Sequence, residues 1–353
     1  MPNLTFCSRC VMDGTDPDLI LDNKEVCNHC HSAQKSLKEI EAEKPNLPKI
    51  IERIKRDGKG KTYDCLIGMS GGVDSSMVLH HAVELGLRPL CFTIDNGFNN
   101  PKADENIMRL VETLKVPFYR YTIDLKKFSE AQSAFMRGGV MNLEVLTDHI
   151  LFASTYEMAN KYGIKWILSG GNSATESIMP KSFGPEDARD LRFIKSVYKE
   201  NTGKELTGLP MISLWKEQYY RIIKQKKFLR LLDYTDYNRE NSKNLLKELY
   251  NWTDYGEKHC ESIFTQWYQS FYLFTKYGVD KRKAHFASLI NSGQMTRSEA
   301  MFLLTASPVY PVLGIEERVL KYPKKSYNDY KNSAWIRKQV VKIYKFIPKS
   351  WKS

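Results

Sequence analysis

An apolar segment, a glycine turn and a helix start follow one another directly near residue 63, and this succession constrains the fold most. Residues 63–69 (YDCLIGM) are expected to form a buried strand, and SGGVDSS at 70–76 follows at once. Two successive glycines let the backbone turn sharply and approach a ligand closely. A helix that starts at Asp74 leaves unpaired N–H groups and a positive dipole end at the turn. The unit is therefore expected to bind an anion, above all phosphate.

The glycine turn is not a Walker loop, because it lacks the four-residue spacer between glycines and the Lys-Ser/Thr that follows. It resembles the pyrophosphate loop, SGGxDS, of the PP-loop ATP pyrophosphatases, which split ATP into AMP and pyrophosphate. The resemblance implies that pyrophosphate is held by Ser70, Gly71, Gly72 and Ser75. An ordinary glycine-containing turn between strand and helix is the alternative.

Strands and helices are expected to alternate after residue 62. The expected strands are residues 63–69, 88–95, 117–123 and 165–169. The expected helices are residues 74–85, 103–114, 126–137 and 143–162. Such alternation predicts an α/β fold with a doubly wound parallel sheet, of the PP-loop ATP pyrophosphatase type, and helices on both of its faces.

Two further strand ends carry residues suited to ATP. Thr93 and Asp95 end the second expected strand, and Gly170 and Gly171 follow the fourth. Because ligands bind beyond the carboxyl ends of parallel strands, both loops are expected to join the glycine turn in one site. Asp74 and Asp95 are the candidates for orienting Mg²⁺ or the ATP ribose. Simple turn chemistry is the alternative for both loops.

Four of the seven cysteines form two Cys-x-x-Cys pairs separated by 16 residues: Cys7, Cys10, Cys27 and Cys30. This spacing is typical of a four-thiolate zinc site, and with four protein ligands such a site is closed and structural. An iron–sulfur cluster or two disulfides are the alternatives. Cys65 and Cys91 lie in expected strands and are interpreted as buried apolar residues.

The chain is expected to divide into five parts. These are a zinc module (1–31), a helical linker (32–61), an ATP-binding α/β domain (62–200), a helical substrate domain (201–315) and a basic amphipathic tail (316–353). Helices are expected at residues 217–224, 242–250, 259–276, 281–291 and 296–305, the last with a capping box from Thr296 to Glu299.

Most of the net charge lies in the tail. The chain carries +12, and residues 318–353 hold eleven basic residues and one acidic residue, so the body is close to neutral. A near-neutral body argues against a nucleic-acid substrate. No basic n-region with an apolar h-region opens the chain, and no apolar run is long enough to cross a bilayer, so a cytoplasmic location is expected.

The tail is expected to contain an amphipathic helix over residues 333–347. Apolar residues recur at 336, 340, 343 and 347 on one face, with basic residues around the rest and tryptophans at 335 and 351. Such a helix could lie on an anionic membrane surface. A helix docked on the protein itself or on a partner subunit is the alternative.

Two long blocks resemble one family. The first block consists of CxxCVMD at 7–13, the other CxxC pair at 27–30 and SGGVDS at 70–75. The second block runs from WTDYGEKHCES at 252–262 to SGQMTRSEA at 292–300. The chain resembles, over about residues 5–310, the N-acetyl sugar amidotransferases of bacterial surface-polysaccharide biosynthesis, which include lipopolysaccharide and pseudaminic-acid-type enzymes. The resemblance implies that an N-acetyl group on a nucleotide-linked sugar becomes acetamidino. The amide oxygen would attack ATP, pyrophosphate would leave, and ammonia would displace AMP.

The resemblance also implies roles for single residues. With Asp74, the residues expected to be catalytic are Lys258, His259 and Lys281. Glu261, Arg282 and His285 belong to the same polar set, for which a solvated helix face is the alternative. The expected cofactors are ATP, Mg²⁺ and Zn²⁺. Because the chain shows no glutaminase nucleophile elbow, ammonia is expected from a separate glutaminase subunit.

Two other functions fit parts of the sequence. A PP-loop tRNA-modifying (thiolating) enzyme also joins Cys-x-x-Cys pairs to this loop, although it would need an exposed cysteine of low pKa near ATP. A zinc scaffold that binds a nucleotide as a regulator is a non-enzymatic alternative.

Overall fold

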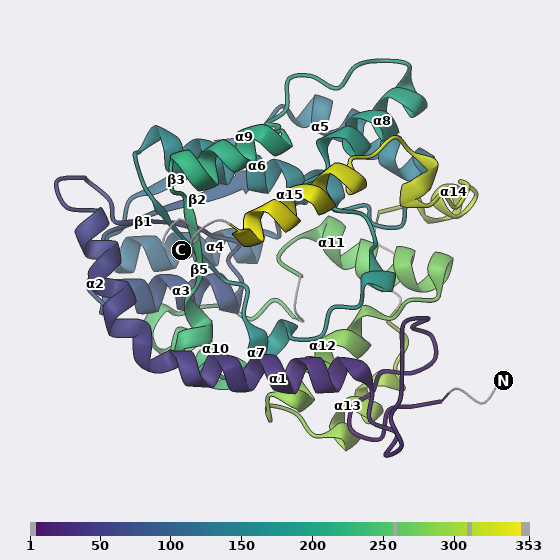
Figure 1. The fold of residues 1–353 in the computed structure, drawn as a ribbon, viewed down its shortest axis with the longest axis horizontal. Helices are drawn as coiled ribbons and strands as arrows, with labels where there is room; N and C mark the ends of the chain where they lie inside the picture. The colour runs from purple at the N-terminus through teal and green to yellow at the C-terminus, as the bar shows by residue number, and fades with distance from the viewer. Residues whose placement is uncertain (1–4, 257–259, 309–312, 347–353) are drawn as a thin grey trace.

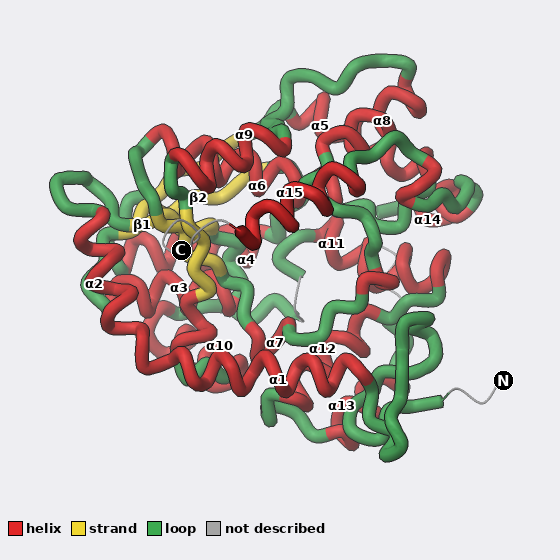
Figure 2. Tube along the Cα trace, in the orientation of Figure 1, coloured by secondary structure: helices red, strands yellow, loops and turns green. Residues whose placement is uncertain are grey.

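A five-stranded parallel sheet forms the centre of the ATP-binding half. The computed structural model describes residues 5–256, 260–308 and 313–346. The strands are β1 (Cys65–Gly68), β2 (Pro89–Asp95), β3 (Phe118–Thr122), β4 (Trp166–Ser169) and β5 (Lys227–Arg230). Their order is β3-β2-β1-β4-β5, and every neighbouring pair is parallel (Figures 1 and 2). The predicted α/β fold with a parallel sheet is confirmed.

Helices cover both faces of the sheet, as a doubly wound fold requires. Alternate residues of β1 point to opposite faces. Ile67 packs in a buried cluster with Met77 of α3 (Val73–Glu84). Leu66 packs on the other side with Met158 of α6 (Val145–Lys161). Strands buried on both faces are apolar throughout, which explains the unbroken Cys-Leu-Ile run of β1.

The remaining helices of the sheet half and the linker also follow the predictions closely. They are α4 (Pro101–Thr113) and α5 (Leu125–Gly138), together with α1 (Asn28–Glu43) and α2 (Leu47–Asp57) before the sheet. A 3₁₀ turn at Lys44–Asn46, which contains Pro45, separates α1 from α2. Cys27 caps α1, so the second cysteine pair runs directly into the linker helix.

The fifth strand was not expected, because the region after residue 201 was predicted to be helical. β5 has only four residues, and Lys227 and Arg230 make it look like a polar loop. Its pairing with β4, which begins with the Lys227 N–H donating to the Lys165 carbonyl (2.8 Å), stabilises it. A short edge strand of this kind depends on a partner far away in the sequence.

The C-terminal half is otherwise mostly helical, as predicted, although the helices at residues 173–176, 191–202 and 316–320 were not expected. Its α-helices are α7 (Ser173–Glu176), α8 (Leu191–Thr202), α9 (Leu214–Gln218), α10 (Arg239–Tyr250), α11 (Ile263–Trp267), α12 (Lys281–Asn291), α13 (Arg297–Leu304), α14 (Glu316–Leu320) and α15 (Ala334–Phe346). π-helical segments at Tyr219–Ile223 and Tyr268–Tyr277 prolong α9 and α11, and short 3₁₀ turns occur at Lys181–Phe183, Leu231–Tyr234 and Tyr327–Asp329. The predicted capping box of Thr296 and Glu299 is present. No described helix combines the length and apolarity needed to cross a bilayer.

One buried cluster joins segments that are far apart in the sequence. It contains the four N-terminal cysteines, Phe128 of α5, Phe193 of α8 and Trp267 of α11. α1 also contacts α7 and α12 along its length (Figure 1). The five-part division predicted from the sequence stays a proposal, because this core is continuous across several of its parts.

Candidate functional site

Gly71 occupies a place that only glycine can fill. Its φ is +77°, in the left-handed region. A Cβ there would lie 2.1 Å from the carbonyl oxygen of Ala103 in α4. The Trp252 indole N–H donates to the Gly71 carbonyl (3.1 Å) and fixes the turn from the other side. The turn is thus held in a single conformation.

The start of α3 is left open to an anion. Gly72 is its N-cap and provides no side-chain hydrogen bond, whereas α4 and α5 are capped by Asn100 and Asp124. The first N–H groups of α3 therefore face the turn without a side-chain acceptor. The Ser70 and Ser75 hydroxyls lie 3.1 Å apart beside them. This arrangement fits the predicted pyrophosphate cradle.

The predicted strand-end residues gather at one edge of the sheet. The chain proceeds outward from β1 to β3 and returns on the other side of β1 at β4, so the loops after β1 and β4 lie at the point where the strand order reverses, which is where such sheets bind ligands. A Cβ on Gly170 would lie 3.2 Å from the Ser75 nitrogen, which shows that these two loops touch. The Gly171 N–H donates to the Ser169 hydroxyl (3.2 Å).

Thr93 and Asp95 lie at the carboxyl end of β2, next to β1. Thr93 is buried, and the Asp95 carboxylate accepts the N–H of Gly97 (3.1 Å), so it forms a local turn. Both residues stand at the same sheet edge as the glycine turn, as predicted. Their contact with ATP remains a proposal.

Asp74 is held by a tyrosine from a distant segment. The Tyr237 hydroxyl donates to the Asp74 carboxylate. Burial, together with the charge of Asp74, raises the pKa of Tyr237, so this hydroxyl remains a donor. Asp74 is only partly buried. A carboxylate oriented by such a hydrogen bond at the carboxyl end of the sheet fits a Mg²⁺ ligand. No local sequence pattern points to Tyr237, since 163 positions separate the two residues.

Tyr255 and Glu261 line the glycine turn from the C-terminal half. A Cβ on Gly72 would lie 3.0 Å from the Tyr255 hydroxyl and 3.8 Å from the Glu261 carboxyl carbon. Burial and the neighbouring Glu261 charge raise the pKa of Tyr255. Both residues belong to the block that begins at Trp252, but the sequence assigned Tyr255 no role.

The segment that starts at residue 260 is attached to the loop between β2 and α4. Asn100 donates its backbone N–H to the Glu261 carbonyl (2.9 Å) and its side-chain amide to the Cys260 carbonyl (3.0 Å). The Ile263 N–H donates to the Phe98 carbonyl (2.9 Å). Lys258 and His259, two of the predicted catalytic residues, lie outside the described residues.

Lys281, the remaining predicted catalytic residue, begins α12 near three carboxylates. Burial lowers its pKa, and the charges of Glu144, Asp148 and Glu176 oppose that shift in part. A Cβ on Gly171 would lie 3.5 Å from a Glu176 carboxylate oxygen, so Glu176 adjoins the loop after β4. Through Glu176, Lys281 is therefore linked to the predicted ATP site.

Arg282 and His285 have structural partners instead. Arg282 pairs with Asp280 (2.7 Å) and donates to the carbonyls of Leu303 and Ala306. A ring nitrogen of His285 lies 3.2 Å from the Thr175 carbonyl. Arg282 is thus committed to holding α12 against the end of α13.

The four N-terminal cysteines converge as the spacing predicts. All are fully buried, and their sulfur atoms lie within 4.8 Å of one another. The Cys7–Cys30 and Cys10–Cys27 separations are 4.0 and 3.8 Å, and all four are free thiols. Ligands of tetrahedral zinc at about 2.3 Å lie about 3.8 Å apart, so the cluster fits a zinc ion. The disulfide alternative does not fit these free thiols.

The cluster also anchors the C-terminal helices. The Asn291 amide donates to the Cys30 sulfur (3.2 Å), and the Arg297 guanidinium donates to the carbonyls of Cys10 (3.0 Å) and Cys7 (3.3 Å). Lys283 pairs with Asp13 (2.5 Å). A metal here would therefore hold α12 and α13 in position, and with α12 it would hold Lys281, the first residue of that helix.

Comparisons with solved structures give distant likenesses. A predicted subunit of tRNA methyltransferase from Methanocaldococcus jannaschii is 16% identical, with a TM-score of 0.30, over 52% of this chain and 74% of that one. NMN synthetase from Francisella tularensis is 16% identical (TM-score 0.29; 63% and 93%). NH₃-dependent NAD synthetase from Campylobacter jejuni is 14% identical (TM-score 0.30; 61% and 93%). No curated protein matches the chain.

One family model matches the C-terminal part. Residues 261–344 match "LPS biosynthesis protein WbpG-like, C-terminal domain". The match begins at Glu261, beside the glycine turn, and includes Lys281 and the helices that hold the cysteine cluster. It confirms the surface-polysaccharide resemblance indicated by the sequence blocks. Residues 261–344 are therefore similar to the C-terminal domain of WbpG-like lipopolysaccharide-biosynthesis proteins, and they follow a parallel α/β sheet whose first strand ends in the SGGVDSS turn.

Proposed function

We propose that the protein is an ATP-dependent amidotransferase that converts the N-acetyl group of a nucleotide-linked sugar to acetamidino. One observation carries the proposal: the first residues of the WbpG-like domain are hydrogen-bonded to the loop after β2, which brings Glu261 to the PP-loop. The start of the region that matches the sugar-biosynthesis domain thus lies next to the predicted phosphate-binding turn. The reaction is placed in the cytoplasm, where ATP and nucleotide-linked sugars are available.

The first step would activate the amide. The amide oxygen forms a bond to the α-phosphorus of ATP, the bond to the β-phosphate bridge breaks, and pyrophosphate leaves with the electron pair. The open end of α3 with Ser70 and Ser75 would hold the departing pyrophosphate. Asp74 and Asp95 would hold Mg²⁺, which supplies positive charge to the leaving group. Tyr237 would keep the Asp74 carboxylate oriented.

The second step would exchange oxygen for nitrogen. Ammonia adds to the activated carbon, the carbon–oxygen bond breaks, AMP leaves, and the attacking nitrogen loses a proton. Lys281 would receive that proton, because burial lowers the pKa of its amine and so favours the neutral form that accepts a proton. Lys258 and His259 are proposed to meet the anionic sugar nucleotide or the leaving groups.

A separate glutaminase is proposed as the source of ammonia. Glutamine hydrolysis needs an activated cysteine. In the sheet, burial raises the pKa of Cys65 well above its usual value and that of Cys91 to about 12, so both are inert thiols. The same burial disfavours a thiolating enzyme, which would need a reactive thiolate beside ATP.

The test is a pyrophosphate-release assay with Mg-ATP and ammonium. A panel of nucleotide-linked N-acetyl sugars is compared with bulk tRNA, and the product mass is read for exchange of O for NH. Release that depends on a sugar, with that mass change, is expected. Release that depends only on tRNA would overturn the proposal and favour the tRNA-modifying enzyme.

A further inference from the structure

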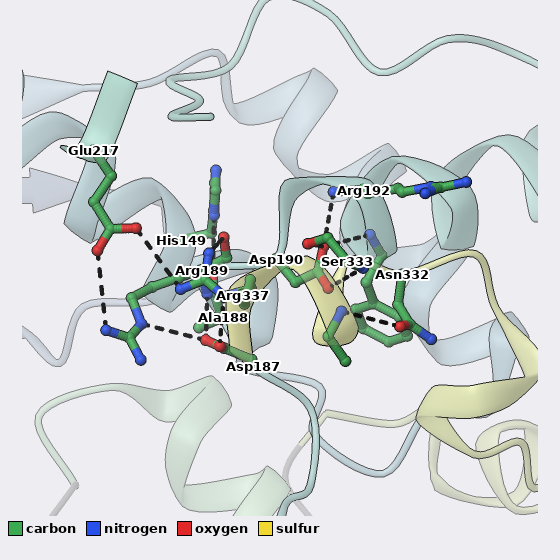
Figure 3. A network of polar contacts seen from close by, with 12 residues as sticks. His149, Asp187, Ala188, Arg189, Asp190, Arg192, Glu217, Asn332, Ser333 and Arg337 are labelled. Carbon is green, nitrogen blue, oxygen red and sulfur yellow. Dashed lines mark hydrogen bonds and ion pairs between the residues drawn. The ribbon is translucent and has the colours of Figure 1, made fainter. Parts of the chain in front are cut away.

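Two surface helices that are distant in sequence are fastened to each other. Arg337 of α15 lies 3.7 Å from Glu217 of α9 and 3.0 Å from Asp187 (Figure 3). Asp190 accepts the backbone N–H and the hydroxyl of Ser333, each at 2.7 Å, where α15 begins. The tail helix is therefore fixed to the body, and its orientation is set by these contacts.

The outer side of α15 carries a tryptophan and two lysines. Arg337 points to the body, and Trp335, two positions earlier, lies on the opposite side of the helix with 73% of its surface exposed. Lys338 and Lys342 follow Trp335 at spacings of three and seven, so they share its face, and both are exposed. Residues 331–346 contain five basic residues and no acidic one.

The outer side of α9 and its π-helical extension carries an apolar row. Trp215, Tyr219 and Ile223 recur at every fourth position and are 70%, 45% and 65% exposed. Glu217, between the first two, is buried and points to Arg337. Lys224 is exposed at the end of the row, with its ammonium 5.7 Å from the Tyr219 ring centre. Both helices thus direct their tryptophans away from the Glu217–Arg337 contact.

We infer that these residues form a docking surface for an anionic phospholipid membrane. The tryptophan–lysine face consists of Trp215, Tyr219, Ile223, Lys224, Trp335, Lys338 and Lys342. Indole rings favour the boundary between lipid headgroups and acyl chains, and lysines flanking them are attracted to anionic headgroups. Large exposed apolar side chains that lie together mark interaction surfaces, and both tryptophans are exposed by 70% or more.

The kind of basic residue distinguishes a membrane from a protein partner. Protein interfaces are enriched in arginine and depleted of lysine. Here Arg337 and Arg221 are both bound to Glu217, at 3.7 Å each, and the exposed cations of the face are lysines. Charge complementarity therefore favours an anionic membrane surface over a protein partner.

The experiment is co-sedimentation of the full chain with vesicles of phosphatidylglycerol and phosphatidylcholine, compared with phosphatidylcholine alone. The W215A/W335A and K338E/K342E variants are compared with F302A and K35E/K38E. These controls remove an exposed aromatic residue (Phe302 is 75% exposed) and two exposed lysines elsewhere. Pyrophosphate release of each variant, in solution, serves as the check on folding.

We expect the wild type and both controls to bind the anionic vesicles and to be released by salt. Each face variant should bind at least about tenfold more weakly, with pyrophosphate release unchanged. Wild type that stays in the supernatant, or face variants that bind as well as the controls, would overturn the inference. Loss of a dimer or of glutaminase binding in the face variants, with no effect on sedimentation, would assign the face to a protein partner instead.

Discussion

At the scale of single residues, Gly71 allows the PP-loop to lie against α4. Replacing it by alanine places a Cβ 2.1 Å from the Ala103 carbonyl oxygen. We expect G71A to abolish ATP-dependent pyrophosphate release and to lower the melting temperature. G60A is the matched control, because Gly60 has the same left-handed φ, +76°, but no atom within 4 Å of its Cβ position. G60A should cost about 1 kcal/mol and leave release intact; equal loss in both variants would contradict a steric role for Gly71.

The Tyr237–Asp74 contact makes a second prediction. Y237F removes the hydroxyl that donates to Asp74, so we expect kcat/KM for ATP to fall about 10- to 100-fold, with about 1–2 kcal/mol lost in stability. Y250F is the control, since the Tyr250 hydroxyl lies 2.7 Å from His80 on the same helix α3 but away from the loop. Steady-state kinetics that decline equally in both variants would show a general effect of α3 on activity.

Substitution of Lys281 should change stability and catalysis in opposite directions. Burial lowers its pKa, so the unfolded chain binds a proton there more strongly than the folded chain. The buried charge therefore destabilises the fold most at low pH, and this cost fades as pH rises toward the usual pKa of lysine. We expect K281M to raise the melting temperature, most strongly below neutral pH, and to abolish amidine formation.

Lys276 provides the control for that experiment. Its pKa is lowered to about 8 by burial, yet its ammonium donates to the Val319 carbonyl (3.0 Å). K276M should lower the melting temperature and retain activity in the folded fraction. Full activity in K281M would remove Lys281 from the proposed mechanism.

At the scale of elements, the cysteine cluster holds helices rather than substrates. Removing the metal should free the contacts of Cys30 with Asn291 and of Cys7 and Cys10 with Arg297. We expect one zinc per chain by elemental analysis, and a strong chelator should lower the melting temperature by 10 °C or more, on the order of a few kcal/mol. The C27S variant should lose zinc, whereas C91S, which replaces a buried cysteine far from the cluster in sequence, should keep it. Iron with visible absorption would support a cluster instead.

The elements themselves differ in how well the sequence predicts them. β1 to β4 and the helices between them each lie within about two residues of their predicted bounds, since apolar patterns and glycine stops are local signals. β5 was missed because four residues with two basic ends look like a loop until β4 pairs with them. The π-helical extensions of α9 and α11 were expected only as helix, because hydropathy does not distinguish the two.

At the scale of the whole molecule, Arg337 fastens the tail to the body. R337A would remove one of the two arginines that pair with both Glu217, which is 2% exposed, and Asp187, so that Arg189 alone bridges these two carboxylates. We expect about 2–3 kcal/mol of destabilisation and rapid proteolysis of the chain after residue 330. K338A removes an exposed charge from the same helix and should leave the cleavage rate unchanged. Equal protease resistance in R337A would show that other contacts hold α15.

The sequence alone determined the glycine turn, the cysteine cluster and the capping box, because local spacing specifies local structure. The SGG turn after an apolar strand, the two cysteine pairs and the capping box each depend on residues within a few positions of one another. The tertiary structure decided which distant groups meet. Tyr237 reaches Asp74, Asn100 holds Glu261 at the PP-loop, Glu176 faces Lys281, and Asp187 binds Arg337. These pairs depend on how helices pack around the sheet, and packing is a property of the whole buried core that no short segment contains.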